Sequence, residues 1–583
     1  MKYPTLYEWE SSRQMIDTFR GYNHNLRISD GEFYDMQNMT SDYYPVLSPR
    51  GKRGVYATPE KPTGMIAKDS LCYVDGTDFV MNEYRIDMGL NDEPKQLISM
   101  GAYVIIMPDK KYINTLDMTD YGNIEASFTS TTDVTFQLCT REGEAYTDTT
   151  VSPTEPESPN NLDLWIDTSS VPHTLKKYST TSAIWVTVPT TYIKITSSGI
   201  GAAFEQYDGI SISGIKAENL QDLNASAVVW SRDDDFIVVV GILDMATTQS
   251  FLEDGAITIK RTMPELDFIT EANNRLWGCR YGVAANGEVV NEIYACKLGD
   301  FKNWNCFMGL STDSYVASCG TDGQFTGAIT HLGYPLFFKE TCLHKVYGNF
   351  PSNFQIQTTA CRGVQKGCER SLAIVNEVLY YKGRSGVCAY DGSLPVEISA
   401  ALGDERYSNA VAGGHGNKYY ISMQSDVDAA YSLLVYDAAK SMWHKEDNLR
   451  ADAFCSCREE LYCIDHNSKQ IITMLGSGTQ DNDAVPWMVQ TGDIGISSPD
   501  MKYVSRINVR MALDVGSEVH FYAQYDFSSY WEPLFTLVGS NLRSFSLPIR
   551  PKRCDNMRLR IVGTGNAKIY SRTNTIEQGS DIS

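Results

Sequence analysis

The sequence has no long hydrophobic run. Its longest apolar run, residues 236–243, is far too short to span a bilayer, because a membrane helix needs about 20 apolar residues. The opening Met1-Lys2-Tyr3-Pro4 also lacks the apolar region of a signal peptide. We therefore expect synthesis in a cytoplasm and no membrane insertion.

Positive charge is scarce as well. Lys and Arg number 50 against 72 Asp and Glu, which gives a formal net charge of −22. Such a chain repels nucleic acid on average, so sequence-specific DNA binding is a poor interpretation. An acidic surface can instead border a passage along which a polyanion moves without sticking.

Signatures of catalysis are missing too. No Gly-x-Ser-x-Gly motif occurs, the 8 histidines are scattered, and the Ser-x-Asp-x-Gly-x-Thr-Trp boxes of sialidases are not repeated. We predict no catalytic residue, no cofactor and no enzymatic activity. A glycosidase with carboxylates spaced around a propeller channel stays open as an alternative, since the geometry between blades is invisible in one sequence.

Metal-binding motifs are incomplete. Cys455, Cys457, Cys463 and His466 are the strongest zinc candidates, but structural zinc sites usually use Cys-x-x-Cys turns, so core packing is the favoured interpretation. The acidic run 233–235 lacks the alternating ligands of a calcium loop and reads as a solvated turn. No metal is predicted. The 14 cysteines occur in strand-like contexts, which indicates reduced thiols in a core.

One local pattern recurs from residue 259 to 475. Each unit has a short apolar or aromatic strand, a turn built on Gly or Asp, and a second similar strand. Examples are residues 274–279, 334–339, 377–382, 417–422 and 460–465. Alternation over four to eight residues indicates half-buried strands, and recurrence roughly every 40–60 residues is typical of four-stranded propeller blades. We predict an all-β chain with a β-propeller of about six blades.

Composition divides the rest of the chain. Residues 119–258 are rich in Thr and Ser, with a Pro-rich loop at 152–159, and indicate a β-domain inserted between blades. Small polar residues after 475 indicate a linker, and the alternating strands beyond it indicate a β-sandwich. The predicted parts are an extended N-terminal arm (1–62), a first blade (63–118), the inserted domain (119–258), the remaining blades (259–475), a linker (476–484) and a C-terminal β-sandwich (485–583).

The N-terminal arm has glycines and asparagines that favour positive φ, and prolines that oppose helix. It therefore reads as extended chain held by partners rather than by a core of its own. Two interpretations stay open. The arm contributes a strand that closes the propeller by pairing with the last blade, or it docks on a neighbouring subunit.

The order of motifs in the arm is similar to that of a known group of proteins. Its ordered motifs are Phe19-x-Gly21, Gly31-Glu32-Phe33, Asn38-Met39 and Pro45-x-Leu47-x-x-Arg50-Gly51. Followed by a propeller, this order resembles nozzle, tail-hub or head-stabilisation proteins of short-tailed phages, and structural proteins of Firmicutes phages and prophages. The resemblance implies a structural protein of the virion tail, synthesised in the cytoplasm of the bacterial host.

The resemblance further implies a homo-oligomeric ring, such as a hexamer, that contacts portal, adaptor or other tail proteins and surrounds genome DNA during ejection without reading its sequence. The candidate subunit-contact residues are Phe19, Tyr22, Asn23, Asn38, Pro45 and Arg50.

Four arginines stand out in the C-terminal domain. Arg506, Arg510, Arg558 and Arg560 lie on alternating positions of predicted strands in an otherwise acidic chain. They form either a solvated sheet face or an interface with an acidic neighbour. An alternative function is a propeller at the tail tip that binds a receptor or glycan, with aromatic residues of the inserted domain or of loops such as residues 349–351 as contacts. A hydrolase of cell-wall sugars is the third interpretation.

Overall fold

The computed structural model describes residues 11–146, 148–241, 251–253, 256–284, 287–479, 485–495 and 501–578. The chain divides into two compact units. Unit 1 comprises Met1–Lys95, Phe337–Leu343 and Thr358–Ser583, and unit 2 comprises Gln96–Leu336 and His344–Gln357. Within the described ranges, no helix is long and apolar enough to cross a membrane.

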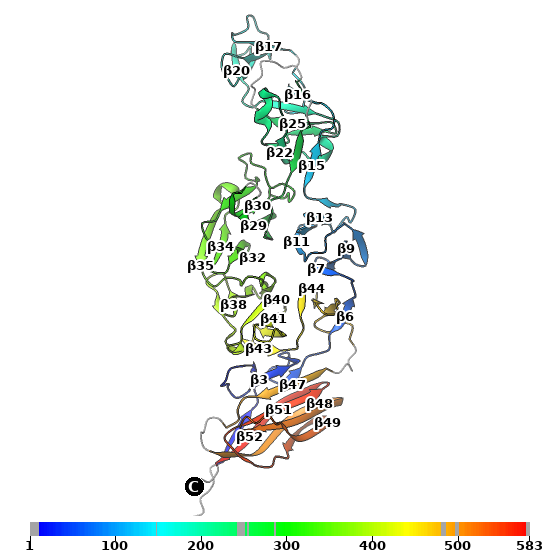
Figure 1. Cartoon of the computed structure of the whole chain (residues 1–583), viewed down its shortest axis with the longest axis vertical. Helices are drawn as coiled ribbons and strands as arrows, with labels where there is room; N and C mark the ends of the chain where they lie inside the picture. Colours follow the sequence, from blue (N-terminus) through cyan, green and yellow to red (C-terminus); the bar gives the residue numbers. More distant parts are fainter. Residues whose placement is uncertain are drawn as a thin grey trace, which may run out of the picture. The chain divides into compact units, whose positions relative to one another are not determined.

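Four-stranded sheets whose strands pair in meander fashion are the main element of the chain (Figure 1). In the part of the chain that the structure describes there are seven of them, and they are the blades of a β-propeller. Their strands are β7 (Pro62–Ala67), β8 (Leu71–Asp75), β9 (Asp78–Met81) and β10 (Tyr84–Asp87); β11 (Gln96–Met100), β12 (Tyr103–Met107), β13 (Lys111–Asn114) and β14 (Tyr121–Asn123); β28 (Phe268–Ala272), β29 (Arg275–Val283), β30 (Val289–Ala295) and β31 (Tyr315–Ser318); β32 (Phe325–His331), β33 (Tyr334–Lys339), β34 (Cys342–Tyr347) and β35 (Gln355–Ala360); β36 (Ala373–Val375), β37 (Val378–Lys382), β38 (Val387–Tyr390) and β39 (Val396–Glu397); β40 (Tyr407–His415), β41 (Lys418–Ser425), β42 (Tyr431–Asp437) and β43 (Met442–Lys445); and β44 (Ala451–Cys457), β45 (Glu460–Asp465), β46 (Ile471–Thr473) and β6 (Gly54–Ala57).

Central blade strands are buried on both faces, because each blade packs against neighbours on either side. In β41, five consecutive residues from Tyr419 to Met423 are buried. In unit 1, one apolar cluster joins Tyr420 of β41 and Leu433 of β42 to Leu461 of β45. Burying side chains of this size stabilises by roughly 1.5–3 kcal/mol each. The prediction of an all-β propeller with an inserted domain and a C-terminal sandwich is confirmed, and the described residues form seven blades where about six were predicted.

The blade boundary at the start of the chain differs from the prediction. The range 63–118, predicted as one blade, includes the strands of one four-stranded sheet, β7 to β10, and most of a second, β11 to β14. The predicted single blade therefore corresponds to two sheets. The outer strands β10 and β14 are mostly exposed, so no apolar alternation marks where one blade ends and the next begins.

Strand β6 completes the last blade from the far end of the sequence. Its residues Gly54, Val55 and Ala57 pair antiparallel with Thr473, Ile472 and Ile471 of β46. The Gly54 amide also donates to the Thr473 hydroxyl at 2.9 Å. Closure of the last blade by a strand of the N-terminal segment, one of the two interpretations of the arm, is therefore observed.

The C-terminal domain of unit 1 is built on a nine-stranded sheet within the described residues. Its strands are β1 (Ser11–Ile16), β2 (Gly21–Tyr22), β3 (Glu32–Gln37), β47 (Pro486–Thr491), β48 (Lys502–Tyr525), β49 (Glu532–Leu547), β50 (Arg553–Cys554), β51 (Met557–Thr564) and β52 (Ala567–Gln578). The long strand β48 pairs with β52 before Gly516 and with β51 after it, and pairing is irregular around this glycine, whose φ is +89°. Such an irregularity lets one strand serve two layers of a sandwich.

Three strands of this sheet come from the N-terminal arm. β1 pairs with β52 over six residue pairs. β3 pairs with β47, and Figure 1 shows these two strands in blue and orange. A short sheet of β4 (Met39–Thr40) and β5 (Ser48–Pro49) follows. The predicted boundary at residue 62 thus separates strands that the fold joins, because strand pairing depends on spatial neighbours and not on distance along the chain.

The inserted domain lies in unit 2. Its strands are β15 (Ala126–Thr129), β16 (Val134–Cys139), β17 (Thr149–Ser152), β18 (Leu164–Asp167), β19 (Thr174–Ser179), β20 (Ile184–Thr187), β21 (Tyr192–Thr196), β22 (Gly209–Ser213), β23 (Ser226–Val228), β24 (Ser231–Asp233), β25 (Phe236–Val240), β26 (Phe251–Glu253) and β27 (Thr258–Arg261). Its first and last strands, β15 and β27, pair with each other, so the domain leaves and re-enters the chain at one place. Phe136, Ile195, Ile212 and Ile259 belong to its core.

The described residues include five short 3-10 helices. They are η1 (Gly201–Ala203), η2 (Glu218–Leu223), η3 (Pro351–Asn353), η4 (Glu369–Ser371) and η5 (Ala400–Leu402).

Candidate binding site

The predicted subunit-contact residues of the arm mostly contact the chain itself. Phe19 is buried and stacks on Phe33 at 5.8 Å between ring centroids. Burial, together with the nearby Asp35 carboxylate, raises the pKa of Tyr22 well above its usual value. The Asn23 amide donates to Glu32 at 2.9 Å.

Asn38 and Arg50 tie the arm to both neighbouring parts of unit 1. The Asn38 side chain donates to the Pro486 carbonyl at 2.7 Å and accepts from Arg50 Nε at 3.0 Å. Arg50 also pairs with Glu446 and Asp447, at 3.3 and 3.1 Å. Pro45 is exposed. Contact of these residues with a second subunit stays a prediction.

The four arginines of the C-terminal domain fall into two classes. Arg558 forms an ion pair with Asp493 at 2.6 Å and stacks on Tyr34. Arg560 donates to the Gln490 side chain at 2.7 Å, and its guanidinium lies 4.0 Å from the centre of the Trp531 ring. Burial lowers the pKa of Arg560. Both are therefore engaged within the domain.

Arg506 and Arg510 are the second class. Both side chains are exposed on strand β48. Their contact with an acidic neighbour stays a prediction.

The zinc candidates do not converge. Cys463 pairs with Phe454 in the β44–β45 ladder, so Cys463 faces the opposite side of the blade from Cys455. Burial raises the pKa of Cys463 well above its usual value, and the His466 ring is bonded to Asp452 at 2.7 Å. Nowhere in the described ranges do three or more His, Cys, Asp or Glu side chains form a group able to hold a metal.

The acidic run 233–235 ends strand β24 and forms the turn after it. It links β24 and β25, and the Asp235 carboxylate accepts the Gly199 amide at 2.8 Å. The cysteines are free thiols, most of them buried, as the sequence predicts.

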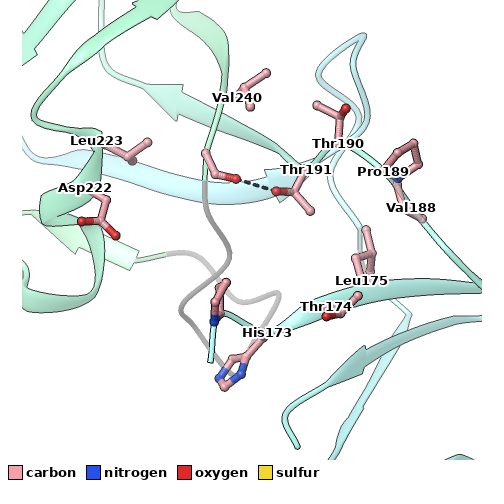
Figure 2. Close-up of a pocket in the computed structure, with 12 residues that line it drawn as sticks. His173, Thr174, Leu175, Val188, Pro189, Thr190, Thr191, Asp222, Leu223 and Val240 are labelled. Atoms are coloured by element: carbon pink, nitrogen blue, oxygen red, sulfur yellow. Dashed lines mark hydrogen bonds between the residues drawn. The ribbon is translucent and has the colours of Figure 1, made fainter. Parts of the chain in front are cut away.

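Figure 2 shows one cavity of the inserted domain, about 440 Å³ in volume. His173 and Asp222 are its ionisable side chains, and the wall between them is made of threonine, proline and aliphatic groups. The Thr191 hydroxyl donates to the Gly241 carbonyl across one side, as the dashed line indicates. The His173 ring is bonded to the Ser170 carbonyl at 2.9 Å. This arrangement provides hydroxyl groups but no paired acid and base.

A larger cavity of about 660 Å³ lies in unit 2 among turns of two neighbouring blades. We call it the hairpin cavity. Its lining residues are Ala272, Asn273, Arg275, Trp277, Leu332, Gly333, Tyr334, Pro335, Val346, Tyr347, Gly348, Asn349 and Phe354.

Two tight turns position the hairpin cavity. Asn273 and Asn274 connect β28 to β29, and Leu332 and Gly333 connect β32 to β33, all with positive φ, as two-residue hairpins require. The Asn273 amide donates to the Gly333 carbonyl at 3.3 Å, which joins the two turns. Leu332 has a left-handed backbone conformation, which is unfavourable for leucine, and its side chain is 54% exposed. Such strain is a reason to look for function.

The third side of the cavity is the loop after β34. Gly348 has φ +109°, and a Cβ there would lie 2.5 Å from the Asn353 carbonyl oxygen, so a side chain is excluded. The Asn353 side chain accepts the amides of Asn349 and Phe350 at 3.0 and 3.1 Å and fixes the loop. These bonds fix the backbone of the loop, and the exposed Asn349 lies on it among the residues that line the cavity.

Aromatic rings form the wall. Trp277 and Phe354 meet edge to face at 4.9 Å, and Tyr334 and Tyr347 lie 5.0 Å apart. Trp277 is only 3% exposed and supports the wall from behind, whereas Tyr334 is 36% exposed. A concave surface with aromatic walls and a few fixed amide groups is typical of a small-ligand site.

Arg275 lies at the base of the cavity. Its guanidinium donates to the carbonyls of Cys296, Asp313 and Ser311 at 2.8, 2.6 and 2.9 Å. Burial lowers its pKa. Since these three acceptors are neutral carbonyls, the arginine anchors the segment 311–313 to its blade, and its positive charge stays close to the cavity.

Sequence reasoning assigned residues 274–279 and 334–339 to blade strands and proposed the loop 349–351 as a ligand contact. It missed Tyr334, Tyr347 and Phe354 as one wall. The turn pairs Asn273-Asn274 and Leu332-Gly333 were the available signal, but a sequence does not reveal that the two turns are neighbours.

No protein-family model matches the chain, and no curated protein matches it either. Several solved structures do. An exo-β-1,3-galactanase from Phanerochaete chrysosporium in complex with β-1,3-galactotriose matches with 8% identity and a TM-score of 0.22, over 52% of this chain and 94% of the enzyme. The β-propeller domain of the Trilobed protease from Pyrococcus furiosus matches with 9% identity and a TM-score of 0.25, over 53% and 89%. A Trypanosoma rangeli sialidase mutant matches with 8% identity and a TM-score of 0.19, over 96% and 95%.

The prediction that the chain is not an enzyme is contradicted by these comparisons, because the similar structures include a glycoside hydrolase and a sialidase. At 8–9% identity, these structures identify neither a particular ligand nor a particular reaction for this chain.

Proposed function

We propose that this chain is a glycan-binding β-propeller and that the hairpin cavity holds the sugar. The observation that carries this proposal is the wall of Trp277, Tyr334, Tyr347 and Phe354 beside the amide groups of Asn273 and Asn349. The C–H groups on one face of a pyranose ring pack on aromatic rings, and its hydroxyls bond to amides.

Retention on an array of bacterial and host glycans tests the proposal, followed by titration of each retained glycan. Tyr334→Ala removes the exposed ring of the wall, and we expect about tenfold weaker binding, or ~1.4 kcal/mol. Tyr84→Ala is the matched control, because Tyr84 is 73% exposed on the edge strand of another blade. Equal affinities of the two variants, or an empty array, would contradict the proposal.

A second candidate function is a structural subunit of a phage tail, located in the virion. The observations that favour it are the order of motifs in the arm and the exposed Arg506 and Arg510 in a chain of net charge −22. In this proposal, identical subunits form a ring, contact portal or adaptor proteins, and border DNA during ejection. Electron microscopy of purified protein and light scattering distinguish a ring from a monomer, and a strict monomer that is missing from particles would exclude it.

A further inference from the structure

The hairpin cavity has an unusual charge for an acidic protein. None of its described lining residues is Asp or Glu, whereas the whole chain has 72 acidic residues against 50 basic ones. The carboxylate of Glu271, which precedes the first turn, accepts the Asn274 amide at 2.8 Å. The cavity wall itself therefore offers no negative charge to repel an anion.

Two cations adjoin this wall. The Lys345 ammonium lies 4.3 Å from the Tyr334 ring centroid and 5.0 Å from that of Tyr347, so it sits against the two tyrosines that line the cavity. The buried Arg275 guanidinium lies 5.7 Å from the Phe354 ring, with its donors directed at carbonyl groups. Arg275 is one of the lining residues, whereas Lys345 adjoins the cavity through the two tyrosines without lining it. Coulomb energies rise where solvent is partly excluded, so both positions favour an anion.

We infer that the ligand of the hairpin cavity is an anionic saccharide, with its acidic group next to Lys345 and a sugar face on Tyr334. This inference rests on the proposed glycan-binding function and specifies its ligand class. Carboxylate sugars and phosphorylated sugars share the required chemistry. Lysine suits either group, because an ammonium acts as a compact charge with rotatable donors and needs no planar partner.

The experiment compares acidic and neutral glycans on the full chain. Carboxylated, phosphorylated and neutral oligosaccharides are arrayed, and retained ones are titrated at low and high salt. We expect retention of acidic oligosaccharides, loss of binding as salt rises, and weaker binding when the acidic group is esterified. The carboxylated and phosphorylated arms identify which acidic group is bound.

Lys345→Gln is the diagnostic variant. It should lower the affinity for the acidic oligosaccharide about fivefold to tenfold and leave the affinity for the esterified oligosaccharide unchanged. Lys345→Arg should keep most of the affinity for the acidic form. Lys568→Gln is the matched control, since Lys568 makes a similar contact with Tyr43 at 4.2 Å in unit 1. Circular dichroism and the thermal midpoint establish that each variant is folded.

The outcomes separate the two proposals. Retention of neutral glycans that Tyr334→Ala weakens and Lys345→Gln does not would overturn the anionic ligand and keep the glycan-binding function. Retention of no glycan would overturn both.

Discussion

The C-terminal domain and the inserted domain are both β-structures, but they are assembled from the chain in opposite ways. In unit 1, strand β1 near the start of the chain pairs with β52 near its end, and Ser11 lies opposite Glu577. In unit 2, the inserted domain is one continuous segment whose terminal strands pair, with Ala126 opposite Arg261. In the first arrangement, strands that are far apart in the sequence share one sheet. In the second, a whole domain is formed by one continuous segment and can be removed as one piece.

Each of the two units also buries an arginine with carboxylates. In unit 1, Arg53 contacts Glu446 at 2.7 Å and Asp447 at 2.8 Å. In unit 2, Arg261 forms an ion pair with Asp208, which also accepts the Asn303 amide at 2.9 Å. The pair in unit 1 joins distant segments, so its loss affects the attachment of the arm. The pair in unit 2 joins strand β27 to the residue that precedes β22.

The largest expected effect comes from deleting each region. Removal of residues 1–57 takes away β1, β3 and β6. Strands β46, β47 and β52 then each lose the partner on one edge. We expect loss of cooperative unfolding, since stability of a domain is only about 5–15 kcal/mol. Circular dichroism and limited proteolysis measure it.

Replacement of residues 130–257 by an Asn-Gly turn is the contrasting deletion. It connects Thr129 to Thr258, which already face each other in the β15–β27 ladder. We expect the shortened chain to unfold cooperatively. If the arm deletion keeps cooperative unfolding while the internal deletion loses it, the comparison is wrong.

The second effect concerns the buried arginines. Arg261→Met leaves the buried Asp208 carboxylate without its cation, so we expect a loss of about 3–5 kcal/mol. Arg53→Met should cost less, because Arg50 still pairs with both Glu446 and Asp447. Denaturant unfolding measures both. Arg232→Met is the control, because Arg232 is 38% exposed and 3.8 Å from Asp234, and it should change stability by less than about 0.5 kcal/mol.

The third effect is a dependence on pH in unit 1. Burial lowers the pKa of His444 to about 3, so the folded state holds this ring neutral. The unfolded ring takes up a proton below about pH 6.5, so stability present above that pH falls as pH drops toward 3, by at most about 1.4 kcal/mol per pH unit. His444→Gln should flatten this slope in denaturant unfolding at pH 7, 5.5 and 4.5.

Asp447 adds to the acid sensitivity at lower pH. Burial alone would raise its pKa, but the attraction of Arg53 and Arg50 outweighs burial and the pKa lies below its usual value. Its contribution is present above the usual carboxyl pKa and is lost as pH falls through the lowered one. An unchanged slope in His444→Gln above pH 4.5 would contradict the assignment to the histidine.

The smallest effects are expected on exposed faces of both regions. Arg506→Ala in β48 and Val186→Ala in β20, where the valine is 48% exposed, should each change stability by less than about 0.5 kcal/mol. Arg558→Ala should cost more, about 2 kcal/mol, because it leaves the nearly buried Asp493 unpaired. Equal losses for Arg506→Ala and Arg558→Ala would contradict the division of these arginines into two classes.

Local sequence patterns were sufficient for the blades. The strands around Tyr334, Tyr380, Tyr419 and Tyr462 were predicted because alternation and turn residues are properties of neighbouring positions. The exposed edge strand β10 was not, since a strand that buries little has no such alternation. The arginines of β51 were seen on one face, but their stacking depends on Tyr34 of strand β3 and on Trp531 just before β49.

The sequence by itself determined that this chain is all-β, rich in blade hairpins, acidic, and interrupted by a separate β-domain, because composition and two-residue periodicity are local. Only the tertiary structure decided that β1 and β3 belong to the C-terminal sheet and that Tyr334, Tyr347 and Phe354 line one cavity beside Lys345. Which strands pair, and which side chains meet in one cavity, depends on the surfaces that pack against each other in the folded chain. A local sequence pattern does not contain that information.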